Sequence, residues 1–309
     1  MKEFIGFENI INGFMKRADN NTLSHAHLIV GPDGIGKSIL AKIFALKILR
    51  KDKEADYIDI INYSPKKASF GVDDVRNIIE EVSKKPYEGN EKVIIIHEGD
   101  KLTIQAQNAL LKTIEEPPKG VFIILLSESL ELLLDTIKSR CQVYKLTPLN
   151  KEHMLSFIKK INITQEESIL SALAYAEGIP GRAERILHDE NLENLRNLVI
   201  KLFNEVINKD INCIVQYEEK FDKFKDEKEE ILSVIASFIR DIIIYKELED
   251  KNILINVDKG KDISKLSSAL SYKKLNSMLG YVEEARKNFI SNVNYSMTMS
   301  VMLIGFLEG

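Results

Sequence analysis

The sequence predicts an α/β fold followed by helical domains, and three observations carry this prediction. Short apolar runs alternate with helix-like segments as far as about residue 147. The motif GPDGIGKS at 31–38 lies between one such run and an apolar helix. Beyond residue 150 no strand-like run persists, and helical periodicity takes over. Alternating strands and helices indicate a parallel sheet with ligands at the carboxyl ends of its strands.

The glycine-rich motif has the context of a phosphate-binding loop, because a short apolar strand precedes it and a helix follows. Its glycines let the backbone take positive φ and bring N–H groups close to an anion. Its lysine adds charge for the outer phosphates, and its serine can ligate Mg²⁺ at the helix start. The alternative is a glycine turn that fits the pattern by chance. The binding residues would be Gly31, Gly34, Gly36, Lys37 and Ser38.

The remaining elements of this part follow from periodicity and from residues that stop helices. His25 and His27 point to the same side of an extended segment, but no third ligand is nearby, which favours packing over a metal pair. We expect helices over 3–20, 39–49, 73–84 and 105–116, strands over 28–30, 57–61, 92–96 and 121–126, and a helix-to-strand turn over 135–145.

The end of the strand over 92–96 departs from the usual chemistry of such sites. A carboxylate normally stands there to hold Mg²⁺ through water, whereas this chain has His97, a poor ligand for Mg²⁺. Glu98 is a candidate for polarising an attacking water. The alternative, equally open, is that Glu98 and Asp100 only cap the next helix.

Two further arginines stand at structural junctions. Arg140 lies in the string SRC at 139–141, within the predicted helix-to-strand turn. Arg182 lies in GIPGRA at 178–183, in the first turn of a helix, where its charge opposes the helix dipole. That penalty favours a functional use for Arg182, with a simple surface arginine as the alternative.

Composition limits the class of protein. The chain has 309 residues, 44% of them hydrophobic and 29% charged, as expected of a soluble globular protein with two or three domains. A net charge of −4 gives no overall attraction to nucleic acid. Cys141 and Cys213 lie far apart, which favours a reducing compartment and predicts no zinc site. With no signal-peptide pattern and no apolar run long enough to span a bilayer, we expect a cytoplasmic protein without a membrane partner.

Four strings together resemble the clamp-loader branch of the AAA+ ATPases, and within it the delta-prime family of bacterial DNA polymerase III. They are GPDGIGKS at 31–38, NALLKTIEEPP at 108–118, SRC at 139–141 and GIPGRA at 178–183. The resemblance covers essentially the whole chain. It implies an AAA+ P-loop domain over 1–147, a helical lid over 148–190 and an all-α collar, used for oligomerisation, over 191–309.

The resemblance also implies roles for single residues. Lys37 and Ser38 would meet phosphates and Mg²⁺, and Ser127 matches the polar residue that senses the γ-phosphate. Arg182 matches the lid arginine that reads nucleotide in the same subunit. Arg140 matches the arginine finger that reaches into a neighbouring subunit's site and stabilises the charge developing there.

In this family, loading opens a ring-shaped sliding clamp and closes it around primed DNA. The expected partners are the delta and gamma/tau motor subunits, with the clamp and primed DNA reached through the assembly. Region 50–62 has no cysteine where many relatives carry a four-cysteine zinc module, so no zinc is expected. His97 favours a rigid stator over a motor. The intact loop predicts ATP and Mg²⁺ binding, with weak or absent hydrolysis.

Two other functions stay open. One is a self-sufficient AAA+ ATPase acting on DNA or protein, against which His97 argues. The other is a purely structural assembly module with a vestigial phosphate loop, which a failure to bind nucleotide would favour. No interleaving of basic and aromatic residues predicts a base-stacking platform, so any contact with DNA would be made to phosphates.

Overall fold

The computed structural model describes residues 4–65, 69–161, 165–208 and 213–308. The chain forms two compact units: Met1–Phe157 with Gly178–Gly181, and Ile158–Glu177 with Arg182–Gly309. Each unit has its own apolar core. The expected three-domain division at 147/148 and 190/191 stays a proposal.

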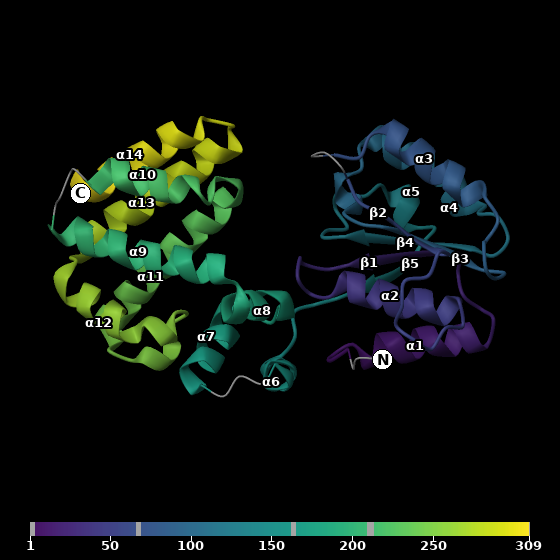
Figure 1. Ribbon diagram of the computed structural model, residues 1–309, viewed down its shortest axis with the longest axis horizontal. Coiled ribbons are helices and arrows are strands. Elements are labelled where there is room, and N and C mark those ends of the chain that lie inside the picture. Colours follow the sequence, from purple (N-terminus) through teal and green to yellow (C-terminus); the bar gives the residue numbers. More distant parts are fainter. Residues whose placement is uncertain (1–3, 66–68, 162–164, 209–212, 309) are drawn as a thin grey trace. The chain divides into compact units, whose positions relative to one another are not determined.

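The first unit is built on a five-stranded parallel sheet in the order β2-β3-β4-β1-β5 (Figure 1). β1 lies between β4 and β5, and Val30 at its end is in register with both Ser127 and Lys145. The carboxyl ends of three neighbouring strands therefore meet where the glycine-rich motif begins. The strands are β1 (Ala26–Val30), β2 (Ile60–Tyr63), β3 (Lys92–Ile96), β4 (Val121–Ser127) and β5 (Gln142–Lys145).

The second strand differs from the expected range of 57–61. The Ile60 N–H donates to the Tyr57 carbonyl, which makes a turn where the strand was expected to begin. The buried Asp59 carboxylate accepts the backbone N–H groups of Tyr87 and Glu88 at 2.7 and 2.9 Å. A pattern of apolar residues does not reveal a carboxylate that binds the backbone of another loop. For this reason the strand was expected to begin three residues too early.

Helices cover both faces of the sheet, with α3, α4 and α5 on one face and α1 and α2 on the other (Figure 1). Alternate strand residues pack on α3 and α4, whereas on the opposite face the ring of Phe14 stacks on Phe44 at 3.6 Å between centroids. The parallel α/β fold is therefore confirmed. The helices are α1 (Glu8–Asp19), α2 (Lys37–Ile48), α3 (Val72–Ser83), α4 (Ile104–Glu115) and α5 (Asp135–Lys138).

Among the described residues beyond β5, all regular structure is helical, as predicted. The core of the second unit is formed by aromatic and branched side chains, with Phe203, Phe238 and Phe306 fully buried. No helix in the described ranges combines the length and the apolar character that a bilayer crossing needs. The helices are α6 (Lys151–Lys160), α7 (Glu166–Ala176), α8 (Pro180–His188), α9 (Glu190–Asn208), α10 (Cys213–Asp222), α11 (Lys228–Leu248), α12 (Gly260–Ala269), α13 (Tyr272–Ile290) and α14 (Tyr295–Glu308).

Candidate functional site

The glycine-rich loop between β1 and α2 presents a row of backbone donors. Gly34 and Gly36 have φ of +78° and +103°, in the left-handed region that glycine tolerates best. Within the described residues, the N–H groups of Gly34, Gly36, Lys37 and Ser38 donate to no protein acceptor. Unpaired amides at the start of a helix form a concave site for an anion. The loop therefore fits a phosphate group.

Neighbouring backbone holds this loop in shape on three sides. The Gly31 N–H donates to the Ser127 carbonyl at 3.2 Å, and the Gly181 N–H donates to the Gly34 carbonyl at 2.9 Å. A Cβ on Gly31 would lie 2.6 Å from the Leu146 carbonyl oxygen, and one on Gly181 only 2.8 Å from the Gly34 Cα. The strings GPDGIGKS and GIPGRA, distant in sequence, thus meet at two glycines, which a larger residue would separate.

The amine of Lys37 stands among carboxylates. Its Nζ donates to the carbonyls of Gly31 and Pro32 at 2.8 and 3.1 Å, so it bonds the loop itself. Burial lowers the pKa of Lys37, and nearby negative charges oppose that shift. Those charges, strongest first, belong to Glu128, Asp33, Asp100 and Glu98.

A neutral imidazole occupies the end of β3. The Nε2 of His97 is 2.9 Å from Asn62 Oδ1, and because an amide oxygen only accepts, Nε2 carries the hydrogen. Burial lowers the pKa of His97, against the opposing charge of Glu98. His97 lines a cavity of about 330 Å³ together with Ser38. In the described part of the chain, no group of three or more His, Cys, Asp or Glu side chains is placed to hold a metal.

The two acidic residues after His97 do not cap a helix. The Glu98 carboxylate forms an ion pair with Lys101, and the start of α4 is capped instead by Thr103, whose Oγ1 accepts the Ala106 N–H at 3.2 Å. Asp100 accepts from the Glu128 N–H at 2.9 Å and therefore braces the end of β4. The capping interpretation was wrong because Thr103, the residue directly before α4, takes the capping position.

Ser127 lies at the end of β4 with a fully buried side chain. Its hydroxyl faces two acceptors, Asp100 Oδ1 at 3.2 Å and the Ser129 carbonyl at 2.8 Å. One hydroxyl hydrogen serves both, so the Ser127 side chain is held in one orientation beside the loop. Sequence reasoning missed the part played by Asp100, whose only signal was a carboxylate shortly after a strand end.

Arg140 follows α5 in the turn that leads into β5. Its Nε pairs with the Glu115 carboxylate at the end of α4, and its Nη1 donates to the Thr136 carbonyl at 3.0 Å. The guanidinium side chain remains 38% exposed. Burial raises the pKa of the Cys141 thiol to about 12, so this neighbour stays protonated. The strings EEPP and SRC thus meet at one ion pair.

Gln107 of α4 holds the loop that leads to α5 and to the arginine turn, which is the turn that carries Arg140. No sequence motif indicated this role. Its Nε2 donates to the carbonyls of Leu102 and Leu132 at 3.1 and 3.0 Å, and its Oε1 accepts the Leu134 N–H at 2.8 Å. All the polar groups of this buried amide point to backbone. Gln107 therefore fixes the path of the chain between β4 and α5.

The two histidines pack against different aromatic rings. His27 is buried, and its Nδ1 is 3.2 Å from the Tyr144 hydroxyl, while its ring packs edge-on against Phe14. His25 packs instead against Phe122. The packing interpretation of His27 is confirmed.

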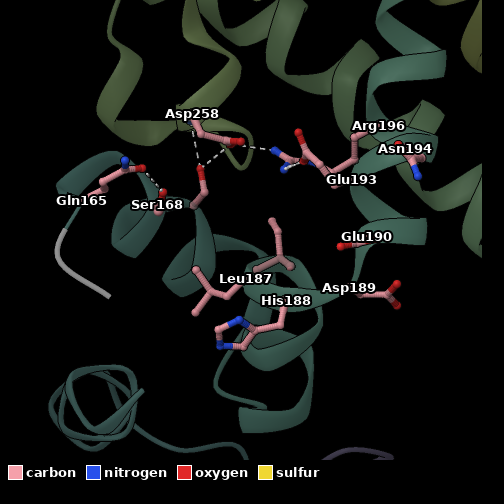
Figure 2. Close-up of a pocket in the computed structure, with 12 residues that line it drawn as sticks. Gln165, Ser168, Leu187, His188, Asp189, Glu190, Glu193, Asn194, Arg196 and Asp258 are labelled. Carbon is pink, nitrogen blue, oxygen red and sulfur yellow. Dashed lines mark hydrogen bonds and ion pairs between the residues drawn. The ribbon is translucent and has the colours of Figure 1, made fainter. Parts of the chain in front are cut away.

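The second unit holds Arg182 and a polar cavity. Arg182 lies in the first turn of α8, as expected, and its Nη1 donates to the Glu177 carboxylate at 3.0 Å. A cavity of about 720 Å³ opens between α7, α8 and α9, and Figure 2 shows the Asp258 carboxylate facing the Arg196 guanidinium at its edge. Arg196 is buried and already bonded to Asn256, Asp258 and Glu193. The cavity therefore offers no unpaired buried charge to a ligand.

Comparison with known proteins covers both units. Residues 6–150 match the family described as "DNA polymerase III, delta subunit", and residues 190–308 match "DNA polymerase III, delta subunit, C terminal". The DNA polymerase III subunit delta' of Bacillus subtilis is 26% identical, covering 94% of this chain and 93% of its own. That of Haemophilus influenzae is 33% identical over 57% of this chain and 58% of its own.

Solved structures agree at the level of the fold. A DNA polymerase III gamma subunit-related protein from Thermotoga maritima has a TM-score of 0.55 at 18% identity, covering 96% of this chain and 98% of its own. A RuvB variant from Thermotoga maritima has a TM-score of 0.51 at 16% identity, covering 99% of this chain and 88% of its own. The matches at both ends of the chain and the sequence relatives together decide its membership. The chain belongs to the delta-prime subunit family of bacterial DNA polymerase III.

Proposed function

We propose that this chain is a stator-type subunit of a DNA polymerase III clamp loader, which helps to place a sliding clamp on primed DNA. Its proposed partners are the gamma/tau motor subunits, the delta subunit and, through the assembly, the clamp and DNA. Family membership over both units supports this role. The helical C-terminal part is the proposed collar through which the subunits associate.

The observation that carries the proposal is the setting of Arg140. Its guanidinium is partly exposed and fixed by Glu115 and Thr136, and none of its hydrogen bonds goes to the phosphate loop of its own chain. A cation held in one place costs no reorganisation when charge develops nearby. Arg140 is therefore suited to stabilise a transferring phosphoryl group in a neighbouring subunit, as a trans arginine finger.

The chain's own loop supports nucleotide binding more than nucleotide cleavage. The free amides of the loop and the amine of Lys37 would bind phosphate oxygens, with Ser38 meeting Mg²⁺ only when nucleotide is present. ATP brings its phosphates already bound to Mg²⁺, which neutralises their charge. His97, however, offers a neutral nitrogen where an oxygen ligand is preferred, and Lys101 already engages the Glu98 carboxylate. We therefore propose weak or absent hydrolysis, with Ser127 and Arg182 as further contacts to nucleotide.

The test is ATP turnover by the reconstituted loader with clamp and primed DNA, comparing the natural chain with Arg140→Ala. Loss of a trans arginine costs about 10³-fold at the site that it serves, though the other sites of the assembly mask part of this loss. We expect a clear fall in turnover while the subunits still assemble. Arg76→Ala is the matched control, because Arg76 is an exposed arginine of the same unit whose only ion pair in the described part of the chain is with Asp73.

Unchanged turnover by an assembled Arg140→Ala loader would refute the arginine finger and favour the purely structural module. Steady ATP hydrolysis by this chain alone would instead favour the self-sufficient ATPase. Arg140→Lys separates charge from geometry, since lysine keeps the positive charge but loses the planar fork of donors.

A further inference from the structure

The Glu128 carboxylate, beside the phosphate loop, has no hydrogen-bond or ion-pair partner among the residues that the structure describes. Glu128 follows Ser127 directly, and its backbone N–H is fixed by Asp100 at 2.9 Å. Its side chain is exposed, and among the residues that the structure describes its carboxylate makes no hydrogen bond or ion pair. A side-chain charge without a partner, on a backbone that is held in place, attracts or repels any charged ligand that binds beside it.

The position of Glu128 is set by backbone contacts to the loop. Ser127 is in register with Val30, and its carbonyl accepts the N–H of Gly31, the first residue of the loop. β4 therefore contacts the loop through Ser127, and Glu128 is the next residue along the chain. Consistent with this placement, its charge acts on the Lys37 amine more strongly than that of any other carboxylate around it.

The other carboxylates around Lys37 differ from Glu128 in their partners or their place. Lys101 pairs with Glu98, and Asp100 accepts two hydrogen bonds from the end of β4. Asp33 belongs to the loop itself and not to the end of β4. Glu128 alone stands at the end of β4, next to the hydroxyl that would meet the third phosphate.

We propose that Glu128 makes this site prefer a nucleoside diphosphate to a nucleoside triphosphate, because its negative charge repels the third phosphate. This inference rests on the proposed nucleotide site and names its ligand class. A carboxylate several ångströms from one additional phosphate charge, in a partly solvated site, changes affinity by about fivefold. The subunit would then keep a nucleoside diphosphate bound while the neighbouring subunits hydrolyse ATP.

The experiment measures the affinity of the purified full chain for fluorescent N-methylanthraniloyl derivatives of ADP and ATP, each with Mg²⁺ and with EDTA. We expect Glu128→Gln to raise the affinity for the ATP probe about fivefold and for the ADP probe less than twofold. Glu128→Asp, which keeps the charge, should behave as the natural chain does. Glu131→Gln is the matched control, since Glu131 is an exposed glutamate three residues further along the same loop.

An equal gain for both probes would overturn the inference, because it would show a general effect of charge. A loss of ATP affinity in Glu128→Gln only when Mg²⁺ is present would also overturn it and would make Glu128 part of a metal site. If no variant binds either probe, the inference fails, but the Arg140→Ala comparison in the assembled loader still judges the proposed function separately.

Discussion

The buried His27 links the stability of the first unit to pH. His27 in β1 is 1% exposed, and its Nε2 has no hydrogen-bond partner among the described residues. Burial lowers the pKa of His27 from 6.5 to about 4. The unfolded chain therefore binds a proton between these two values and the folded chain does not. The contribution of His27 to the free energy of unfolding is therefore complete above pH 6.5 and decreases as the pH falls toward 4.

We predict that stability drops by about 2 kcal/mol between pH 7 and pH 5 from His27 alone. His27→Gln should remove most of this dependence, because glutamine has no proton to gain. Urea unfolding followed by circular dichroism at the two pH values measures the difference. His25→Gln is the control and should keep the full pH dependence, since His25 lies outside the core. Equal pH dependence in the His27 variant and the natural chain would contradict the prediction.

At the scale of elements, α4 connects the parts of the candidate site in the first unit. Thr103 caps its start, Gln107 binds the loop between β4 and α5, and Glu115 at its end holds Arg140. This one helix thus sets the distance between the arginine turn and the end of β3. Each contact uses a polar side chain, so the placement depends on hydrogen bonds as well as on apolar packing.

Gln107→Leu should therefore loosen the arginine turn and destabilise the fold. The substitution keeps the size of the side chain but leaves the carbonyl of Leu102 and the N–H of Leu134 without their partner. We expect a loss of about 2 kcal/mol in the free energy of unfolding. Asn108→Leu, an exposed change on the same helix, should cost far less. Comparable urea midpoints for the two variants would show that Gln107 does not brace this loop.

At the scale of the molecule, a buried polar network links three helices of the second unit, α7, α9 and α11. Arg196 of α9 donates to Asn256 and to Asp258 at 2.6 Å, and Asp258 in turn accepts the Ser171 hydroxyl of α7 at 2.7 Å. Asp241 of α11 accepts the Asn256 N–H at 2.7 Å. Burial alone would raise the pKa of Asp258, but its hydrogen bond with Arg196 and the arginine charge outweigh this and lower it.

Arg196→Met should break this network and leave Asp258 without its charge partner, at a cost of about 3 kcal/mol. We expect peptides from α7, α9 and α11 to lose protection together in hydrogen exchange measured by mass spectrometry. Lys201→Met, an exposed change on α9, should leave the protection unaltered. Loss of protection in α7 alone would mean that the network does not join this helix to the others.

The sequence predicted the elements well where apolar residues alone decide them. The run at 92–96 became β3 with the same bounds, and β4 begins at Val121 as expected but ends at Ser127, one residue beyond the expected range. The roles of polar side chains were harder, because they depend on partners brought together by tertiary packing. Lys92, for example, is 1% exposed, and its amine bonds the carbonyls of Glu81 and Lys84 at the end of α3.

The candidate site shows the same division. The glycine motif identified the loop, because positive φ and free amides are local properties of that segment. The brace from Asp100 to Ser127 and the contact of Gly181 with Gly34 join residues far apart in sequence. No periodicity encodes such distances, so these contacts could be found only in the folded structure.

The contact between Gly181 and Gly34 also determines when, during synthesis of the chain, the loop can take its final shape. The loop is made early in synthesis, but the backbone groups that hold it belong to residues made much later. At about 5–20 residues per second, the roughly 150 residues between Gly34 and Gly181 take on the order of ten seconds to be made. The anion-binding surface therefore takes its final shape only after the ribosome has moved well past the sheet that carries it.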